Sequence, residues 1–190
     1  MRQNCITISL ELPEFDVLWT AEYDSLIEIK VVKRVEFAIC PKCGKPTHHF
    51  HDERVDDVWD MPALGKGIKL LVVKRRWWCC NPDCPQTTPF TEGFDSLDLG
   101  QHRTHRLNSY IYRLTKRMSN AEVVREMAHY QIPISESTVR RLHQAFAQRE
   151  VDNRLLRQRR VIGMDEFSIK KQHTYATIIT DLINKDIVDQ

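Results

Sequence analysis

The 190-residue chain lacks any apolar run of about 18 residues, so no stretch of it has the length of a transmembrane helix. Its N-terminus, Met-Arg-Gln-Asn-Cys-Ile, lacks the basic-then-apolar layout of a signal peptide. Internal repeats and low-complexity segments are also missing, and the composition is ordinary for a globular protein. These absences argue against a membrane-spanning or exported protein, and they predict a cytoplasmic location with no membrane partner.

The chain also lacks a large charge imbalance, because its formal net charge is only +2. The distribution of charge is more informative. Residues 1–30 carry two cations against six acids, whereas residues 66–78 carry five cations and no carboxylate. Residues 103–160 hold thirteen Lys and Arg against five acids. A basic middle between acidic ends is expected of a DNA-contacting segment, with solvated helix faces as the plain alternative.

Six cysteines are present, and five of them lie in two short motifs, Cys40-Pro-Lys-Cys43-Gly and Cys79-Cys80-Asn-Pro-Asp-Cys84. In a chain without an export signal, cysteines beside Pro and Gly turns favour a metal over disulfides. Zinc takes four thiolate or imidazole ligands in a tetrahedron, and a two-residue spacer lets both sulfurs of one turn reach it. The sequence therefore predicts a structural zinc site, because a complete ligand set leaves no open position for chemistry.

The second motif leaves the ligand set open. Cys79 and Cys80 both precede Cys84 at a usable spacing, and successive strand residues point to opposite sides, so only one of the two should face the metal. Three histidines near the first pair are alternative ligands, although four thiols are already available: His48, His49 and His51. Cys5 stands alone and is expected to be a buried apolar residue in a strand.

Alternating apolar and polar residues predict strands through the first 77 residues. The pattern marks residues 6–10, 17–21, 26–32, 55–62 and 68–77, with a Leu64-Gly-Lys-Gly turn before the last. The first three indicate a small antiparallel sheet that leads into the first cysteine pair. Trp77 and Trp78 end the last strand, where packing in the core or against the metal site is expected and base stacking is the alternative.

Three helices are predicted in the basic middle of the chain. Apolar residues at helical spacing mark the first, over residues 102–118. A capping box, Ser119-Asn-Ala-Glu122, opens the second, which Pro133 is expected to end. Either Ser135 or Ser137 then caps the third. The tight connection before the last helix indicates a helix-turn-helix, with a plain three-helix bundle as the alternative.

In a helix-turn-helix, the N-terminal part of the last helix meets base edges, while neighbouring basic side chains contact phosphates. The candidates for base contact lie off the apolar face of the third helix: Ser137, Thr138, Arg140, Arg141 and Gln144. The candidates for phosphate contact lie in and before the first helix: Arg103, Arg106, Arg113, Lys116 and Arg117. These residues predict double-stranded DNA as the partner.

Beyond residue 160, alternation predicts strands at residues 161–170 and 175–182 and the start of a third at Asp186. The first carries the acidic pair Asp165 and Glu166. A carboxylate at a strand end can supply one ligand of a catalytic divalent metal, but two-metal phosphoryl chemistry needs several carboxylates from separate elements. From these residues alone, structural acids are the better interpretation.

Four motifs follow one another between Cys40 and Val188: a Cys-Pro-x-Cys-Gly pair, an Arg-Arg-aromatic strand running into Cys-x-Asn-Pro-Asp-Cys-Pro, a helix-turn-helix, and Ile-Gly-Met-Asp-Glu-Phe before Tyr-Ala-Thr-Ile-Ile-Thr-Asp-Leu. This order resembles the N-terminal part of insertion-sequence transposases of the ISL-three type. The resemblance implies that the zinc module and the helix-turn-helix bind the terminal inverted repeats of an element. It also implies a following ribonuclease H-like domain, whose Asp-Asp-Glu triad binds divalent metal and cuts and joins DNA.

The resemblance also assigns residues. It implies that the zinc ligands are Cys40, Cys43, Cys79 and Cys84, with Cys80 at a variable position. It matches Asp165 to the first acid of the triad and leaves Glu166 unassigned. The family's second Asp and final Glu would lie beyond residue 190, so Mg²⁺ is expected only if the catalytic domain is completed. The chain is therefore expected to bind DNA without cleaving it.

The sequence thus predicts an α+β chain in four parts. These are a β segment (1–39), a zinc-ribbon-like module (40–95), a helix-turn-helix domain (100–150) and the truncated start of a ribonuclease H-like catalytic domain (160–190). The leading interpretation is the DNA-recognition part of a bacterial, nucleoid-associated transposase, acting as a homo-oligomer or mixed with intact transposase. Two alternatives stay open: a zinc-dependent transcriptional regulator, and a modulator of an intact transposase.

Overall fold

The computed structural model describes residues 11–155, 162–170, 174–181 and 186–189. By its contacts the chain divides into two compact units, Met1–Val139 and Arg140–Gln190, and each is considered by itself. Two features expected from the sequence lie outside the described residues: Cys5 and the strand at residues 6–10.

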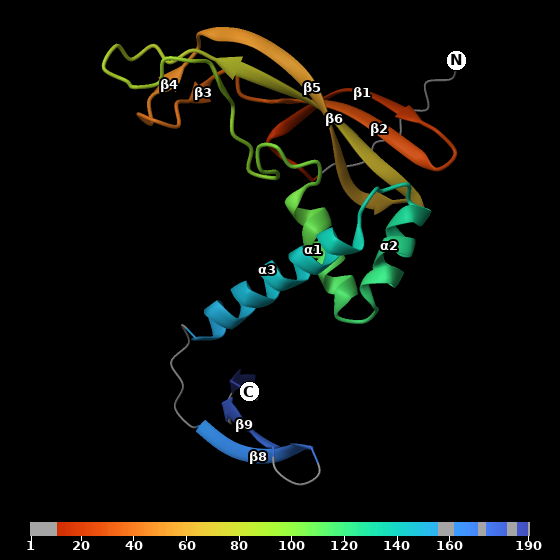
Figure 1. Ribbon diagram of the computed structural model, residues 1–190. Helices are drawn as coiled ribbons and strands as arrows, with labels where there is room; N and C mark the ends of the chain where they lie inside the picture. Colours follow the sequence, from red (N-terminus) through yellow and green to blue (C-terminus); the bar gives the residue numbers. More distant parts are fainter. Residues whose placement is uncertain (1–10, 156–161, 171–173, 182–185, 190) are drawn as a thin grey trace. The chain divides into compact units, whose positions relative to one another are not determined.

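The first unit contains a five-stranded sheet in the order β1-β2-β6-β5, with β7 paired to β6 (Figure 1). Its strands are β1 (Phe15–Glu22), β2 (Leu26–Lys33), β5 (Phe50–Ala63), β6 (Lys66–Trp77) and β7 (Phe90–Thr91). The β1–β2 and β5–β6 pairs are antiparallel, whereas β2 and β6 run parallel. Strands from the first 39 residues and from the cysteine-bearing segment therefore share one sheet.

One face of this sheet forms the main core, because apolar residues recur at every second position. Ile27, Ile29 and Val31 of β2 lie beside Ile68, Leu70 and Val72 of β6, and all six are buried. Leu12, Phe15, Val58 and Leu97 complete the buried cluster. Each such side chain stabilises the fold by about 1.5–3 kcal/mol through burial.

The turn between β5 and β6 lies in the expected segment but is two residues long, because Lys66 and Gly67 already belong to β6. Leu64 and Gly65 connect the paired residues Ala63 and Lys66, and their φ angles are 56° and 74°. Two successive positive φ angles define a type I′ turn, whose twist matches that of the flanking strands. The expected hairpin is therefore present, and β5 begins five residues earlier than the alternation indicated, at Phe50.

Three helices follow the sheet, namely α1 (His105–Thr115), α2 (Asn120–His129) and α3 (Glu136–Leu155). The first begins three residues later than expected, because the side chain of Thr104 accepts a hydrogen bond from the Leu107 amide and caps the helix. The expected capping box of α2 is present, with Ser119 and Glu122 satisfying each other's backbone amides. Helix α3 crosses from the first unit into the second.

The end of α2 differs from the expectation that Pro133 ends it. The helix ends at His129, and Gln131 adopts the left-handed conformation with φ 59°. The amide of Gln131 donates to the Ala128 carbonyl, and the amide of Ile132 donates to the Met127 carbonyl. This is a Schellman motif, and the burial of Ile132 supplies its usual apolar contact.

Ser135 caps α3, which settles the choice left open between two serines. Its Oγ accepts a hydrogen bond from the Thr138 amide at 3.3 Å, and its carbonyl accepts one from Val139. The helix-turn-helix assignment itself stays a prediction.

Among the described residues, no helix combines the length and the apolar character needed to cross a membrane.

The second unit also contains a small antiparallel sheet in the order β10-β9-β8. Its strands are β8 (Ile162–Lys170), β9 (Thr174–Asp181) and β10 (Asp186–Asp189), close to the expected boundaries. Asp165 stands opposite Ile178 in this sheet. The ribonuclease H-like assignment stays a prediction.

Candidate metal centre and nucleic-acid interface

Two tight turns position the cysteines. Cys40 and Cys43 lie in the turn of a small hairpin formed by β3 (Ala38–Ile39) and β4 (Pro46–Thr47). Gly44 follows them with φ 69°, a conformation that glycine adopts without a steric penalty, and its amide donates to the Cys40 carbonyl. The second pair follows the end of β6, where the amide of Cys84 donates to the Asn81 carbonyl at 3.1 Å.

The four sulfurs converge. Cys40 Sγ lies 3.7 Å from Cys84 Sγ, and Cys43 Sγ lies 3.6 Å from Cys79 Sγ. All four sulfurs lie within 4.8 Å of one another. Zn–S bonds of about 2.3 Å in a tetrahedron separate the sulfurs by about 3.8 Å, so the cluster fits Zn²⁺. The metal would stabilise the two turns and leave no free coordination position.

Cys80 and the three nearby histidines are not members of this cluster. Cys80 is exposed, and its sulfur lies 3.2 Å from the hydroxyl of Thr47. His51 accepts a hydrogen bond from the Trp78 indole at Nδ1. By the sulfur positions, the structure groups Cys79 rather than Cys80 with the remaining three cysteines.

A second, smaller core backs the cysteines. Trp77 is 3% exposed and packs with Ala38, Cys40 and Phe90. Trp77 therefore has the expected packing role, whereas Trp78 is only half-buried and lies edge-on to His51. Because the cluster has few apolar members, we expect it to depend on the metal more than the main core does.

The surroundings of the four cysteines shift the pKa values of their thiols in different directions. A hydrogen bond from the Lys45 backbone is the main cause that lowers the pKa of Cys43 to about 7. The Asn81 backbone lowers the pKa of Cys79, but burial and the three neighbouring thiols outweigh it and raise this pKa to about 12. Four thiolates at this spacing repel one another, and a divalent cation removes that repulsion.

The five cations of residues 66–78 are all paired with carboxylates, so this basic run is not an unneutralised surface. Each one lies within 3.1 Å of a carboxylate supplied by another part of the first unit. The pairs, cation first, are Lys66–Glu22, Lys69–Glu28, Lys74–Asp56, Arg75–Glu92 and Arg76–Asp52. The acidic run of residues 52–60 and the basic run of residues 66–78 lie on the two arms of one hairpin, and the remaining candidates for DNA contact lie on the helices.

The candidates for base contact lie near the start of α3. Ser137, Arg140, Arg141 and Gln144 are exposed there, and Thr138 is half-buried. Val139 is fully buried on the opposite side of the helix. This segment therefore presents polar and cationic side chains to solvent, as contact with a DNA groove requires.

The candidates for phosphate contact divide into two groups. Arg113, Lys116 and Arg117 are exposed at the C-terminal end of α1. Arg106 instead forms two hydrogen bonds with the buried carboxylate of Asp60, and Arg103 donates to Asn108 at 3.1 Å. The structure therefore gives Arg103 and Arg106 a role in positioning α1, and their contact with DNA stays a prediction.

Asp165 lies on β8 with its side chain exposed, and its carboxylate accepts a hydrogen bond from the Glu166 amide at 2.9 Å. Glu166 is exposed as well. Adjacent strand residues point to opposite faces, so these two carboxylates do not make a two-metal site together. In the part of the chain that the structure describes, the four cysteines are the group of three or more potential ligands that converges.

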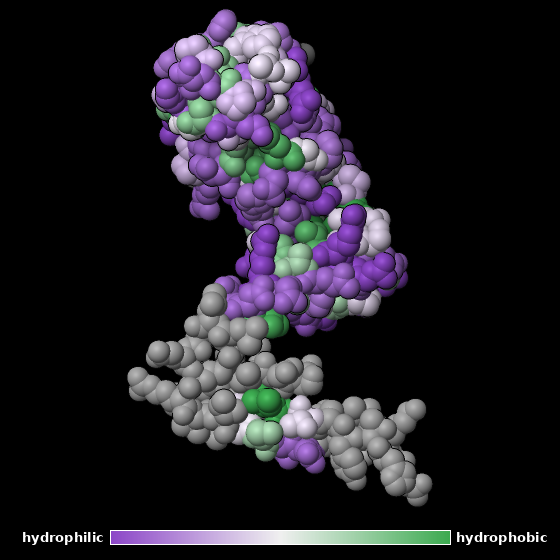
Figure 2. Space-filling view, turned by 60° about the vertical axis from the view of Figure 1, so that its left-hand side comes forward, coloured by the Kyte–Doolittle hydropathy of each residue, from purple (hydrophilic) through white to green (hydrophobic). Residues whose placement is uncertain are grey.

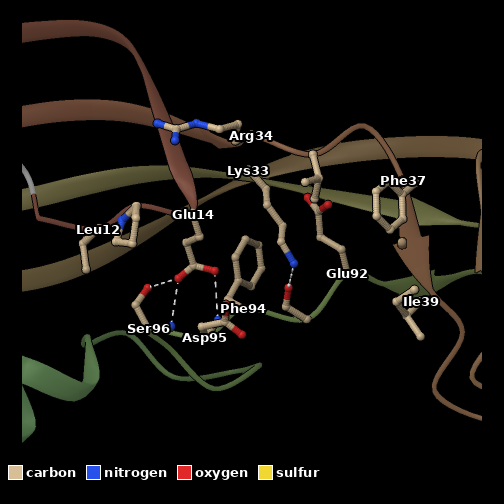
Figure 3. Close-up of a pocket in the computed structure, with 14 residues that line it drawn as sticks. Leu12, Glu14, Lys33, Arg34, Phe37, Ile39, Glu92, Phe94, Asp95 and Ser96 are labelled. Carbon is tan, nitrogen blue, oxygen red and sulfur yellow. Dashed lines mark hydrogen bonds between the residues drawn. The ribbon is translucent and has the colours of Figure 1, made fainter.

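A groove of about 780 Å³ lies between the end of β2, β3 and the segment at residues 92–96 (Figure 3). Its polar lining is already used within the fold, since Glu14 accepts hydrogen bonds from the Asp95 and Ser96 amides and Lys33 donates to the Gly93 carbonyl. Phe37 and Ile39 supply exposed apolar surface on its other side. On the face drawn in Figure 2, hydrophilic residues cover most of the coloured surface, and hydrophobic residues show between them at several places.

The four-sulfur cluster, carried by a β-hairpin and by the end of a long strand, defines a zinc-ribbon-like protein. Residues 36–84 match a family model described as the zinc-finger of transposase IS204/IS1001/IS1096/IS1165. The matched segment ends at Cys84 and contains all four clustered cysteines.

A curated relative extends the similarity beyond the zinc ribbon. The chain is 26% identical over 172 residues to the transposase for insertion sequence element IS1001 of Bordetella parapertussis. The alignment covers 90% of this chain and 40% of that transposase. No solved structure matches the chain. The expected resemblance to ISL-three-type transposases is thereby confirmed.

Proposed function

We propose that this chain binds double-stranded DNA, at the terminal inverted repeats of an insertion element, as the DNA-recognition part of a transposase. The similarity to a transposase over 90% of the chain carries the proposal. The tight α2–α3 connection supports it, because the Schellman motif and the Ser135 cap leave only residues 130–135 between the helices. Helix-turn-helix proteins use such a connection to present the second helix to the major groove.

In this proposal, different residues contact the bases and the phosphates of the DNA. Ser137, Arg140, Arg141 and Gln144 contact base edges, while Arg113, Lys116 and Arg117 contact phosphates. The zinc ribbon stabilises the module, and Asp165 has no part in DNA recognition. Cleavage and joining of strands need further carboxylates, so DNA binding without cleavage remains the prediction for these 190 residues. The DNA that such a protein binds lies in the bacterial nucleoid.

The proposal is tested by DNA-binding titrations on sites selected from random sequence. Affinity should fall at least roughly tenfold between about 50 and 200 mM salt, because phosphate contacts release counterions. Arg140→Ala or Arg141→Ala should each weaken binding by roughly 1–3 kcal/mol if the side chain reaches a base. Asp165→Ala should leave the affinity unchanged, and Arg34→Ala, on the sheet, serves as a charge-matched control.

The outcomes separate the candidate functions. Failure to enrich any sequence, with zinc-loaded and folded protein, would refute DNA recognition. Loss of binding in Asp165→Ala would contradict the assigned division of tasks. Recovery of a sequence found at inverted element ends supports the transposase interpretation, whereas recovery of a promoter sequence supports the regulator.

A further inference from the structure

Thr47, at the end of β4, carries a buried hydroxyl beside the four-sulfur cluster, and its side chain is 2% exposed. The hydroxyl donates a hydrogen bond to the Trp78 carbonyl at 2.7 Å and accepts one from the His49 amide at 3.2 Å. The sulfur of Cys80 lies 3.2 Å from the same oxygen. A hydroxyl has one proton and two lone pairs, and Trp78 takes the proton. The Cys80 thiol is therefore the donor in the third contact, and the hydroxyl has no bonding position left.

These contacts connect the two halves of the metal centre. Thr47 pairs with Ala38 in the hairpin whose turn carries the first cysteine pair. Trp78 directly precedes Cys79 in the chain. The Trp78 amide donates to the His49 carbonyl at 2.8 Å, so both backbone polar groups of Trp78 are bonded to residues at and just after β4. The backbone that carries Cys79 is thus held against the first half by contacts within the protein.

A second polar contact between the two halves differs in exposure. Lys45 Nζ donates to Asn81 Oδ1 at 3.3 Å, and this pair is exposed. Water can take the place of either partner in an exposed pair. Thr47 is almost completely enclosed, so removing its hydroxyl deprives the Trp78 carbonyl of its donor in a site with little access for solvent. Leaving a buried acceptor without its partner costs more free energy than an average hydrogen bond supplies.

We infer that Thr47 is a positioning residue of the zinc site. Its hydroxyl holds the Trp78 carbonyl, and through that backbone it keeps the Cys79 sulfur beside that of Cys43, at the observed 3.6 Å. Groups that orient metal ligands without touching the metal strongly influence metal affinity. The inference requires that the four cysteines bind zinc, and it does not require DNA binding. Cysteine spacing in the sequence marks the ligands, but it does not mark Thr47.

Zinc affinity, measured by competition with a chelator of known affinity, tests this role. Thr47→Val keeps the branched shape, removes the hydroxyl and should lower the affinity about 10–100-fold. Thr47→Ser keeps the hydroxyl and should bind zinc as the wild type does. Thr104→Val is the matched control, because the Thr104 hydroxyl is also buried and donates to Asp60 at 2.6 Å, at the start of α1. It should lower the unfolding temperature and leave the zinc affinity unchanged.

Cobalt spectra separate positioning from a general loss of stability. When Co²⁺ replaces Zn²⁺, the energies of its d–d bands depend on the arrangement of the four sulfurs around the metal. Thr47→Val should shift these bands, whereas Thr47→Ser and Thr104→Val should give the wild-type spectrum. A folded Thr47→Val protein with wild-type affinity and wild-type bands would overturn the inference. So would a Thr47→Ser protein that loses as much affinity as Thr47→Val.

The contact with Cys80 offers a competing explanation, which a double substitution tests. If Thr47 acts through the Trp78 carbonyl, Thr47→Val should lower the zinc affinity by the same factor in the wild-type and in the Cys80→Ala background. A loss that disappears in the Cys80→Ala background would overturn the inference, because Thr47 would then act by restraining a competing thiol.

Unfolding curves are measured for every variant. If Thr47→Val does not fold, Thr47→Ala removes the same hydroxyl with less bulk, and Thr104→Ala becomes its control. None of these measurements involves DNA. A failure of this inference therefore leaves the proposed function standing, and a failure of DNA binding leaves the role of Thr47 standing.

Discussion

Cys79 and Cys80 are neighbours in sequence with different surroundings. Only the first lies with the other three sulfurs, while Cys80 is exposed beside Thr47. Cys80→Ser should therefore retain about one zinc per chain and the wild-type unfolding temperature, whereas Cys79→Ser should lose both. Metal analysis measures the zinc content of each variant, and thermal unfolding measures its unfolding temperature. Equal zinc loss in both variants would mean that Cys80 is a ligand.

The buried Lys74 has a single carboxylate, that of Asp56, as its counter-charge. Its side chain is completely buried, and its ammonium lies 2.9 Å from Asp56. Asp56→Asn leaves that ammonium without a counter-charge, which should cost about 3–5 kcal/mol of unfolding free energy. Urea denaturation at pH 7 measures the loss. Asp16→Asn, which removes an exposed pair with Arg34, is the control and should cost less than about 1 kcal/mol.

The same pair predicts a pH dependence with a defined sign. Burial raises the pKa of Asp56, but the hydrogen bond and charge of Lys74 outweigh it, so the pKa lies below its usual value. A carboxyl group with a lowered pKa stabilises the folded state above its unfolded pKa of about 4, and this contribution is lost as the pH falls through the folded pKa. The difference in stability between wild type and Asp56→Asn should therefore shrink below about pH 4. A difference in unfolding free energy that stays constant down to pH 2 would contradict this pH dependence.

At the scale of elements, the sequence predicted the capping box that begins α2 together with its hydrogen bonds. Ser119→Ala removes the cap and should cost about 1 kcal/mol of unfolding free energy. Ser109→Ala is the control, because that hydroxyl bonds only to a carbonyl within α1 and should change stability by less than about 0.5 kcal/mol. Equal effects would show that the capping box contributes nothing measurable.

Strand and helix periods were predicted well where one face is buried, as in β2 and α1, because a buried face imposes a regular pattern on the side chains. The ends of elements were less predictable. Helix α2 ends at His129 and is followed by Gln131 in the left-handed conformation, a residue that gives no local signal comparable to glycine. The parallel pairing of β2 with β6 joins segments about 40 residues apart, and no local pattern specifies it.

At the scale of the whole molecule, the zinc site and the main core should respond differently to metal removal. The cluster around Trp77 has only three buried partners, whereas the main cluster includes ten buried residues. A chelator should therefore increase amide hydrogen exchange in β3, β4 and β7, while the β2–β6 pairing stays protected. Simultaneous loss of protection in both regions would mean that the metal stabilises the entire first unit.

By itself, the amino-acid sequence determined the zinc-binding cysteines as two pairs, the strands and helices with buried faces, and the resemblance to transposases. Those features depend on residue type and short spacing. The tertiary structure brings Cys79 together with the other three sulfurs, as the resemblance implied, and it alone paired every cation of β6 with a carboxylate and engaged Arg106 with Asp60. The physical reason is that charge neutralisation and metal geometry depend on distances between side chains from separate elements, which a charge count along the chain does not contain.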